Sequence, residues 1–187
     1  MSCEKNSSAN ITLVAGGARG GKSRYAQNKA EASARATGKE LIFVATAEAR
    51  DDSMTDRIRR HQQDRDERWQ LIEAPLDLAA VLNQAKPNQC LLIDCLTLWL
   101  SNWLCLSDDP ATAKANWQTQ KQAFLTALNT TPAQVILVTN EVGMGIIPMG
   151  QLSRDFVDES GWLHQAIAEI ADEVVLVMFG IEQRLKG

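Results

Sequence analysis

The chain has 187 residues, a formal net charge of −4 and 45% hydrophobic residues. A chain of this length typically forms one globular domain that buries a substantial core. We therefore expect neither a second full domain nor a fold that needs disulfides or a metal for its stability. The acidic balance, with a pI near 5.2, excludes a general nucleic-acid binder, because such proteins need a basic face.

The N-terminus and the cysteines suggest a compartment. Residues 1–10 are polar and lack an apolar run, so we expect a disordered lead-in rather than a signal peptide or anchor, followed by one domain over residues 11–187. The most apolar stretch, residues 90–106, is interrupted by Asp94 and other polar residues and is shorter than the ~20 residues of a membrane span. The four cysteines form no CxxC pair, which favours reduced thiols and a cytoplasmic location.

Apolar runs of strand length alternate with segments of helical periodicity along the whole chain. This order is typical of βα units around a parallel sheet that is buried on both faces. Strands are predicted at residues 11–15, 41–46, 90–94, 135–139 and 174–179, with a weaker one at 70–73. Helices are predicted at residues 22–36, 53–68, 76–85, 96–106, 112–128 and 152–171. The expected fold class is α/β, with a mostly parallel central sheet and helices on both faces.

The segment after the first predicted strand carries the strongest motif. Residues 16–23 read GGARGGKS and fit GxxxxGK[ST] between a strand and a helix, the context of a phosphate-binding loop (P-loop). Backbone N–H groups and the positive end of the helix dipole would bind phosphate oxygens. Lys22 would neutralise the outer phosphates, and Ser23 would offer its hydroxyl to Mg²⁺. A glycine-rich turn that merely joins strand to helix does not explain the Lys-Ser pair, so a single P-loop NTPase-like domain is predicted.

An acidic residue ends the predicted strand at residues 90–94. P-loop enzymes hold their metal with an acidic group at the end of a neighbouring buried strand, and Asp94 occupies that position. We expect Asp94 to contact Mg²⁺ directly or through water. A second, compatible interpretation is that Asp94 is the N-cap of the helix that begins at Leu96.

Residues 57–65 form the one strongly basic stretch of the chain and contain His61. In a helix, Arg57 and His61 share a face, and Arg65 lies one turn further on. Clustered cations disfavour a charged imidazole and attract polyphosphate, so a neutral His61 could attack a phosphorus atom. The alternative is a solvated helix in which His61 is incidental, and the pattern leaves both open. The other histidine, His164, is expected on an ordinary helix surface.

A glycine-containing loop, residues 140–148, follows the strand predicted at residues 135–139. The carboxyl ends of parallel strands line the ligand crevice, so Asn140 and Glu141 should lie at the mouth of the site. The loop lacks the NKxD motif of switch GTPases, which disfavours that class. The alternative is a structural turn that Glu141 caps.

The helix predicted at residues 96–106 has one strongly apolar face. Large apolar side chains recur on it at helical spacing. Packing in the core is the expected role, and contact with a second subunit is the alternative. The face consists of Leu96, Trp99, Leu100, Trp103 and Leu104.

Four segments together, GGARGGKSRYA, VATAEARDDSMTDRIRRHQQDRDERW, LLIDCLT and VTNEVGMGIIP, resemble the bifunctional adenosylcobinamide kinase/adenosylcobinamide-phosphate guanylyltransferase family of cobalamin biosynthesis. The resemblance spans about residues 11–177. It implies a cytosolic enzyme that phosphorylates adenosylcobinamide with a nucleoside triphosphate. The enzyme then transfers GMP from GTP to adenosylcobinamide phosphate through a guanylylated histidine, releasing pyrophosphate. GTP and ATP are the implied substrates, Mg²⁺ the implied cofactor, and a homotrimer the implied assembly.

The same resemblance assigns site residues by motif. It implies catalytic roles for His61 and Lys22 and a metal at Ser23 and Asp94. Three positions depart from the family pattern: Gly20 stands where Ser is usual, Asp66 where Pro is common, and Asp94 is one methylene shorter than the alternative Glu. The implied nucleotide contacts are Gly16, Gly17, Ala18, Arg19, Gly20, Gly21, Lys22, Ser23, Val44, Ala45, Thr46, Gln62, Gln63, Asp64, Arg65, Glu73 and Asp94.

Two other functions are compatible with the P-loop. A simple small-molecule kinase would use the loop without nucleotidyl transfer. A nucleotide-dependent binding module would hold or hydrolyse nucleotide without an acceptor. The missing NKxD motif weighs against the second class.

Overall fold

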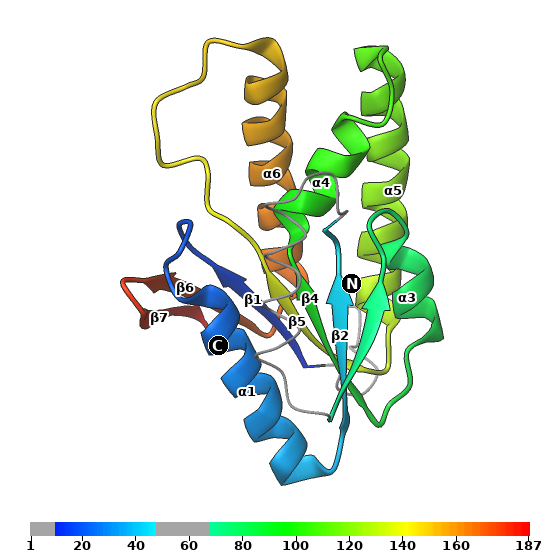
Figure 1. Ribbon diagram of the computed structural model, residues 1–187, viewed down its shortest axis with the longest axis vertical. Coiled ribbons are helices and arrows are strands. Elements are labelled where there is room, and N and C mark those ends of the chain that lie inside the picture. Colours follow the sequence, from blue (N-terminus) through cyan, green and yellow to red (C-terminus); the bar gives the residue numbers. More distant parts are fainter. Residues whose placement is uncertain (1–9, 48–67) are drawn as a thin grey trace, which may run out of the picture.

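The computed structural model describes residues 10–47 and 68–187. Residues 1–9 of the predicted lead-in, most of the helix predicted at residues 53–68, and His61 with its neighbours Gln62, Gln63, Asp64 and Arg65 lie outside the described residues. In chain order the elements are β1 (Ile11–Ala15), α1 (Lys22–Thr37), β2 (Glu40–Ala45), β3 (Trp69–Glu73), α3 (Leu78–Gln84), β4 (Gln89–Asp94), α4 (Leu96–Leu104), α5 (Pro110–Thr130), β5 (Gln134–Val138), α6 (Gln151–Ile170), β6 (Glu173–Met178) and β7 (Ile181–Lys186) (Figure 1).

The strands form one sheet in the order β3-β2-β4-β5-β1-β6-β7. Every described pair is parallel except β6 with β7, which form an antiparallel hairpin. The predicted α/β fold with a mostly parallel sheet is therefore confirmed. Because β1 lies between β5 and β6, and β4 follows β5, the segments that leave these strands meet at one edge of the sheet.

Alternate residues of the five buried strands, β1, β2, β4, β5 and β6, pack into two separate cores. In β4, Leu91 and Ile93 belong to a core with α3, α4, α5 and α6. Cys90 and Leu92 face the other way, into a core that includes Ala26 of α1. Figure 1 shows α1 apart from the other helices, in agreement with this division. Burial on both faces explains why the strands read as continuous apolar runs.

The predicted elements are present within the described residues, including the weaker strand, which is β3. Two helix starts differ by two residues: α3 begins at Leu78 behind the N-cap Asp77, and α5 begins at Pro110 behind the N-cap Asp109. Proline is favoured in the first helical turn, because its missing N–H is not needed there. The antiparallel strand β7 was not predicted. All of its residues are exposed, so it contains no buried run that would have marked it.

The apolar face of α4 belongs to the core, as expected. Trp99 and Leu100 are fully buried, and the Trp99 ring packs against Trp117 and Phe124 of α5 with centroid distances of 4.9 Å in both pairs. The monomer thus covers most of this face, and only Trp103 remains partly exposed. Among the helices of the described segments, none combines the length and apolar character that a bilayer span requires.

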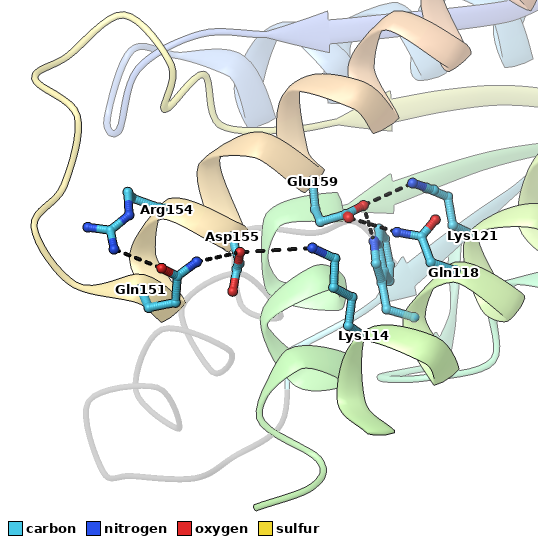
Figure 2. A network of polar contacts seen from close by, with 8 residues as sticks. Lys114, Gln118, Lys121, Gln151, Arg154, Asp155 and Glu159 are labelled. Atoms are coloured by element: carbon cyan, nitrogen blue, oxygen red, sulfur yellow. Dashed lines mark hydrogen bonds and ion pairs between the residues drawn. The ribbon is translucent and has the colours of Figure 1, made fainter. Parts of the chain in front are cut away.

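A buried carboxylate fastens α6 to α5 (Figure 2). Glu159 accepts hydrogen bonds from Trp117 Nε1 at 2.8 Å, Gln118 Nε2 at 2.7 Å and Lys121 Nζ at 2.9 Å. Three donors compensate the desolvation of a buried negative charge. The network fixes α6, whose N-terminus receives the loop from β5.

Candidate active site

The phosphate-binding loop joins β1 to α1 and is closed by its own backbone. Gly20 N–H donates to the Gly17 carbonyl at 3.1 Å, and the buried Lys22 ammonium donates to the same carbonyl at 2.7 Å. The N-cap of α1 is Gly21, with φ 99°, and no side chain caps the helix. Backbone N–H groups of the first helical turn are thus left for an anion.

The glycines of this loop lie directly against the end of β6 and the β6–β7 turn. A Cβ on Gly16 would lie 2.1 Å from the Val177 carbonyl oxygen, and one on Gly21 would lie 3.1 Å from Gly180 Cα. Gly180 N–H also donates to the Gly20 carbonyl at 2.9 Å. Close backbone approach therefore requires glycine here.

Ser23 and Asp94 meet beside the phosphate-binding loop, as predicted. Ser23 Oγ donates to Asp94 Oδ2 at 2.7 Å. The N-cap of α4 is Cys95, which makes no side-chain capping bond, so the interpretation of Asp94 as the N-cap is wrong. A hydroxyl and a carboxylate are the hard oxygen ligands that Mg²⁺ prefers, so this pair fits the metal that the family pattern implies.

Polar side chains link the carboxyl ends of β2, β4 and β5. The buried Thr46 hydroxyl accepts from Cys95 N–H at 2.7 Å and donates to the Cys95 carbonyl at 2.8 Å. Asn140 Nδ2 donates to Thr97 Oγ1 at 3.0 Å. Thr97 Oγ1 also lies 3.0 Å from Cys95 Sγ. The chain of contacts fixes the backbone that follows Asp94, so the Thr46 side chain serves this framework.

The predicted contacts on β2 and β3 lie further along the same edge. Ala45 is paired in register with Glu73 on one side and with Asp94 on the other. Two strand spacings separate Glu73 from Asp94, about 10 Å between their backbones. Val44 and Ala45 are buried, whereas Glu73 is exposed. Among these three residues, Glu73 is therefore the one whose side chain is accessible to a ligand.

The loop after β5 touches the phosphate-binding loop at its start and then leaves it. Glu141 N–H donates to the Gly16 carbonyl at 2.9 Å, which places Glu141 at the mouth of the site, as predicted. Its carboxylate accepts from Gly143 N–H at 2.5 Å, so the turn that Glu141 caps is present as well. Further on, Met144 and Ile146 are largely exposed.

His164 does not lie on an ordinary helix surface, and that expectation is wrong. Its side chain is only 14% exposed, and Nδ1 lies 3.9 Å from Glu141 Oε2. Its Nε2 is 2.7 Å from Thr139 Oγ1 and 3.4 Å from Ser160 Oγ. Burial lowers the pKa of His164, and the nearby Glu141 carboxylate partly offsets that effect. A neutral ring thus connects α6 to the end of β5.

Comparison with known proteins gives a consistent family. The profile of the family described as cobinamide kinase / cobinamide phosphate guanyltransferase matches residues 12–185. The chain belongs to this family. It is 46% identical over 176 residues to the bifunctional adenosylcobalamin biosynthesis protein CobP of Pseudomonas aeruginosa, covering 94% of this chain and 96% of the relative. It is 37% identical over 185 residues to the CobU protein of Escherichia coli of the same description, covering 94% and 99%.

One solved structure is also similar to this member of the cobinamide kinase family. It is the KaiC-like protein PH0186 of Pyrococcus horikoshii, with 16% identity and a TM-score of 0.49. The similarity covers 90% of this chain and 70% of the other.

In this member of the cobinamide kinase family, the phosphate-binding loop, Asp94 and the loop from β5 lie together. Glu73 lies two strands away from Asp94. Sequence reasoning missed the β6–β7 turn, with Phe179 and Gly180, as a neighbour of the phosphate-binding loop. A Phe-Gly pair between two short strand-like segments was the available signal. It went unread because the second segment is polar.

Proposed function

We propose that this chain phosphorylates adenosylcobinamide with a nucleoside triphosphate and then guanylylates the product with GTP. The observation that carries the proposal is the 2.7 Å contact between Ser23 and Asp94 at the foot of the phosphate-binding loop. This is the hydroxyl–carboxylate pair of a P-loop phosphotransferase. Family membership supplies the acceptor, a corrinoid with the alcohol that the first reaction esterifies.

The first reaction is a phosphoryl transfer. The acceptor hydroxyl attacks the γ-phosphorus and gives up its proton to water, the bond to the β–γ bridging oxygen breaks, and a nucleoside diphosphate leaves. Such transfer depends on positioning and electrostatic stabilisation. Loop N–H groups and the Lys22 ammonium hold the phosphates and balance the charge that develops on their oxygens. Ser23 and Asp94 would hold Mg²⁺, which when bound neutralises charge on the outer phosphates.

The second reaction passes through His61 in our proposal. The imidazole attacks the α-phosphorus of GTP, and pyrophosphate leaves, which gives a phosphoramidate. The phosphate of adenosylcobinamide phosphate then displaces histidine from the same phosphorus, which yields adenosylcobinamide-GDP and a free imidazole. Gln62, Gln63, Asp64 and Arg65 are proposed to contact GTP together with the exposed Glu73 side chain and the backbone of Val44, Ala45 and Thr46 at the sheet edge.

We further propose a cytoplasmic homotrimer. Cys90, Cys95 and Cys105, the cysteines of the described segments, form no disulfide, which supports a reducing compartment. Most of the apolar face of α4 is already buried within the monomer, with only Trp103 partly exposed. The loop from β5 to α6 presents an exposed apolar patch suited to contact with a second chain. We call it the 144–152 patch: Met144, Ile146, Ile147, Met149 and Leu152.

A covalent adduct tests the transferase half. The full chain, incubated with α-labelled GTP and Mg²⁺, should form a protein adduct that is labile in acid and stable in base, as a phosphoramidate is. His61→Ala should abolish the adduct and the synthesis of adenosylcobinamide-GDP. The same variant should keep the kinase reaction, because phosphoryl transfer needs no covalent histidine.

Two variants serve as controls for this experiment. Asp94→Asn should lower kcat of both reactions by roughly 10²-fold or more, because one ligand set serves both in the proposal. His164→Asn should still form the adduct, since His164 is bonded to Thr139 and not to the phosphate-binding loop. An adduct that survives in His61→Ala would refute the assignment. A wild-type chain that makes ADP with adenosylcobinamide but never forms an adduct would be a simple kinase.

A further inference from the structure

The β6–β7 turn carries an aromatic residue where the backbone favours a small one. Met178 pairs with Ile181, so Phe179 and Gly180 form a two-residue turn, and their φ angles are 56° and 78°. Such turns prefer Asn-Gly, because positive φ is strained for a bulky residue. The Phe179 side chain is 95% exposed, so packing does not repay this strain. Uncompensated strain of this kind is concentrated at functional sites.

The turn is fastened to the phosphate-binding loop. Gly180 N–H donates to the Gly20 carbonyl at 2.9 Å, and Gly180 Cα lies 3.1 Å from the position of a Cβ on Gly21. Adjacent Cα atoms are 3.8 Å apart, so Phe179 Cα lies within about 7 Å of that position. A phosphate chain in the loop and the Phe179 ring are therefore neighbours at the scale of one nucleotide.

We propose that Phe179 is a stacking platform for the base of the nucleoside triphosphate whose phosphates occupy this loop. The inference rests on the proposed function only in that the loop binds a triphosphate. An exposed aromatic ring beside a phosphate site offers the base a flat apolar surface, and every base can stack on it. Arg24 is also close, with Nη2 3.3 Å from a Cβ position on Gly180. Its cation adds attraction for the phosphate chain.

The occupant is a base rather than a larger apolar partner because of how the turn is held. Val177, Gly180 and the loop glycines are in backbone contact, so whatever fills the loop lies close to the turn that carries Phe179. The corrinoid acceptor and a second copy of the chain are the competing occupants. They predict changes in acceptor KM or in assembly rather than in nucleotide affinity.

A comparison of two ligands tests the platform. Isothermal titration calorimetry with Mg²⁺ would measure ATP and tripolyphosphate binding to the full chain and to Phe179→Asn and Phe179→Trp. Asparagine tolerates the positive φ, so Phe179→Asn should fold. The substitution should weaken ATP binding about 5- to 150-fold, the range expected for one lost base stack, and leave the affinity for tripolyphosphate unchanged. Phe179→Trp should bind ATP with the wild-type affinity. Leu185→Asn, an exposed apolar position on β7, is the matched control and should bind both ligands normally.

Three results would overturn the platform. Phe179→Asn could bind ATP as tightly as wild type. It could weaken ATP and tripolyphosphate equally, which would mean a distorted loop. Or it could alter only the KM for adenosylcobinamide or the molecular mass in solution, which would assign the ring to the acceptor or to a second copy. None of these measurements depends on the transferase reaction. Failure of the proposed function is therefore detected separately, as the absence of both activities in the wild-type protein.

Discussion

Two glycine-containing loops leave neighbouring strands at the same edge of the sheet, and they use glycine for different reasons. In the phosphate-binding loop after β1, a Cβ on Gly16 or Gly20 would strike backbone atoms at 2.1 and 3.0 Å. In the loop after β5, a Cβ on Gly145 would have no neighbour within 4 Å. Gly16 and Gly20 of the first loop are thus in close contact with β6, whereas Gly145 of the second has open space around it.

The difference extends to what each loop presents. The phosphate-binding loop is bonded on both sides, to Gly180 and to Glu141, and it offers backbone N–H groups. The 144–152 patch offers apolar side chains, and Arg154 of α6 binds the carbonyls of Pro148 and Met149 at its far end. A loop that binds phosphate through its backbone N–H groups must be rigid. A loop that contacts an apolar surface through its side chains needs only to be held at its ends.

Gly16→Ala should have the largest effect on this contrast. Its methyl group would collide with the Val177 carbonyl oxygen, and neither backbone can shift without moving β1 or β6. We expect a loss of about 2–4 kcal/mol in unfolding free energy and the loss of measurable ATP binding. Urea unfolding and calorimetric titration would measure the two effects.

Gly145→Ala is the matched control for that substitution. Its new methyl group meets open space, so unfolding free energy should stay within about 0.5 kcal/mol of wild type and ATP affinity should not change. Equal effects of the two alanines on stability would show that glycine serves the same purpose in both loops, contrary to the comparison.

A smaller, assembly-specific effect is expected from Ile146→Asp. Ile146 is 97% exposed, so the folded monomer should tolerate the charge, but an apolar subunit contact should not. Light scattering coupled to gel filtration should show wild type as a trimer and the variant near the mass of one chain, 20.6 kDa. ATP binding should be unchanged.

Leu106→Asp controls for this change, because Leu106 is also exposed but lies after α4, outside the segment that forms the patch. It should remain trimeric. If both variants keep the wild-type mass, the 144–152 patch is not the subunit contact. If wild type is itself monomeric, the trimer is refuted.

The sequence predicted those parts whose signal is local. The sequence predicts that Ser23 and Asp94 share one metal site, because a P-loop and an acidic residue at a strand end can each be identified from a few residues. The order of the strands depends on contacts between distant parts of the chain, which no short sequence segment reveals. The hydrogen bond from Gly180 to Gly20, for example, joins residues 160 positions apart. The polar edge strand β7 lacked a buried run, so its hairpin escaped notice.

His164 shows the same limit at one residue. From sequence it lies on a helix without charged neighbours, and the helix face that it occupies decides its environment. Only the packing of α6 on β5 brings it to Thr139 and Glu141. Partners that come from other elements cannot be read from periodicity.

The smallest expected effect is a pH dependence of stability from His164. Burial holds its pKa in the folded chain below the ordinary value of 6.5, so between that lowered pKa and pH 6.5 the unfolded chain binds more protons. Stability then rises with pH in this window and is lost as pH falls below 6.5, by at most about 1.4 kcal/mol per pH unit for one proton. His164→Asn cannot titrate and can still bond Thr139. Urea unfolding at pH 7.5, 6.5 and 5.5 should give it the shallower decline. Parallel declines in the two proteins would mean that His164 is as accessible to protons folded as unfolded, and that α6 does not seal the end of β5.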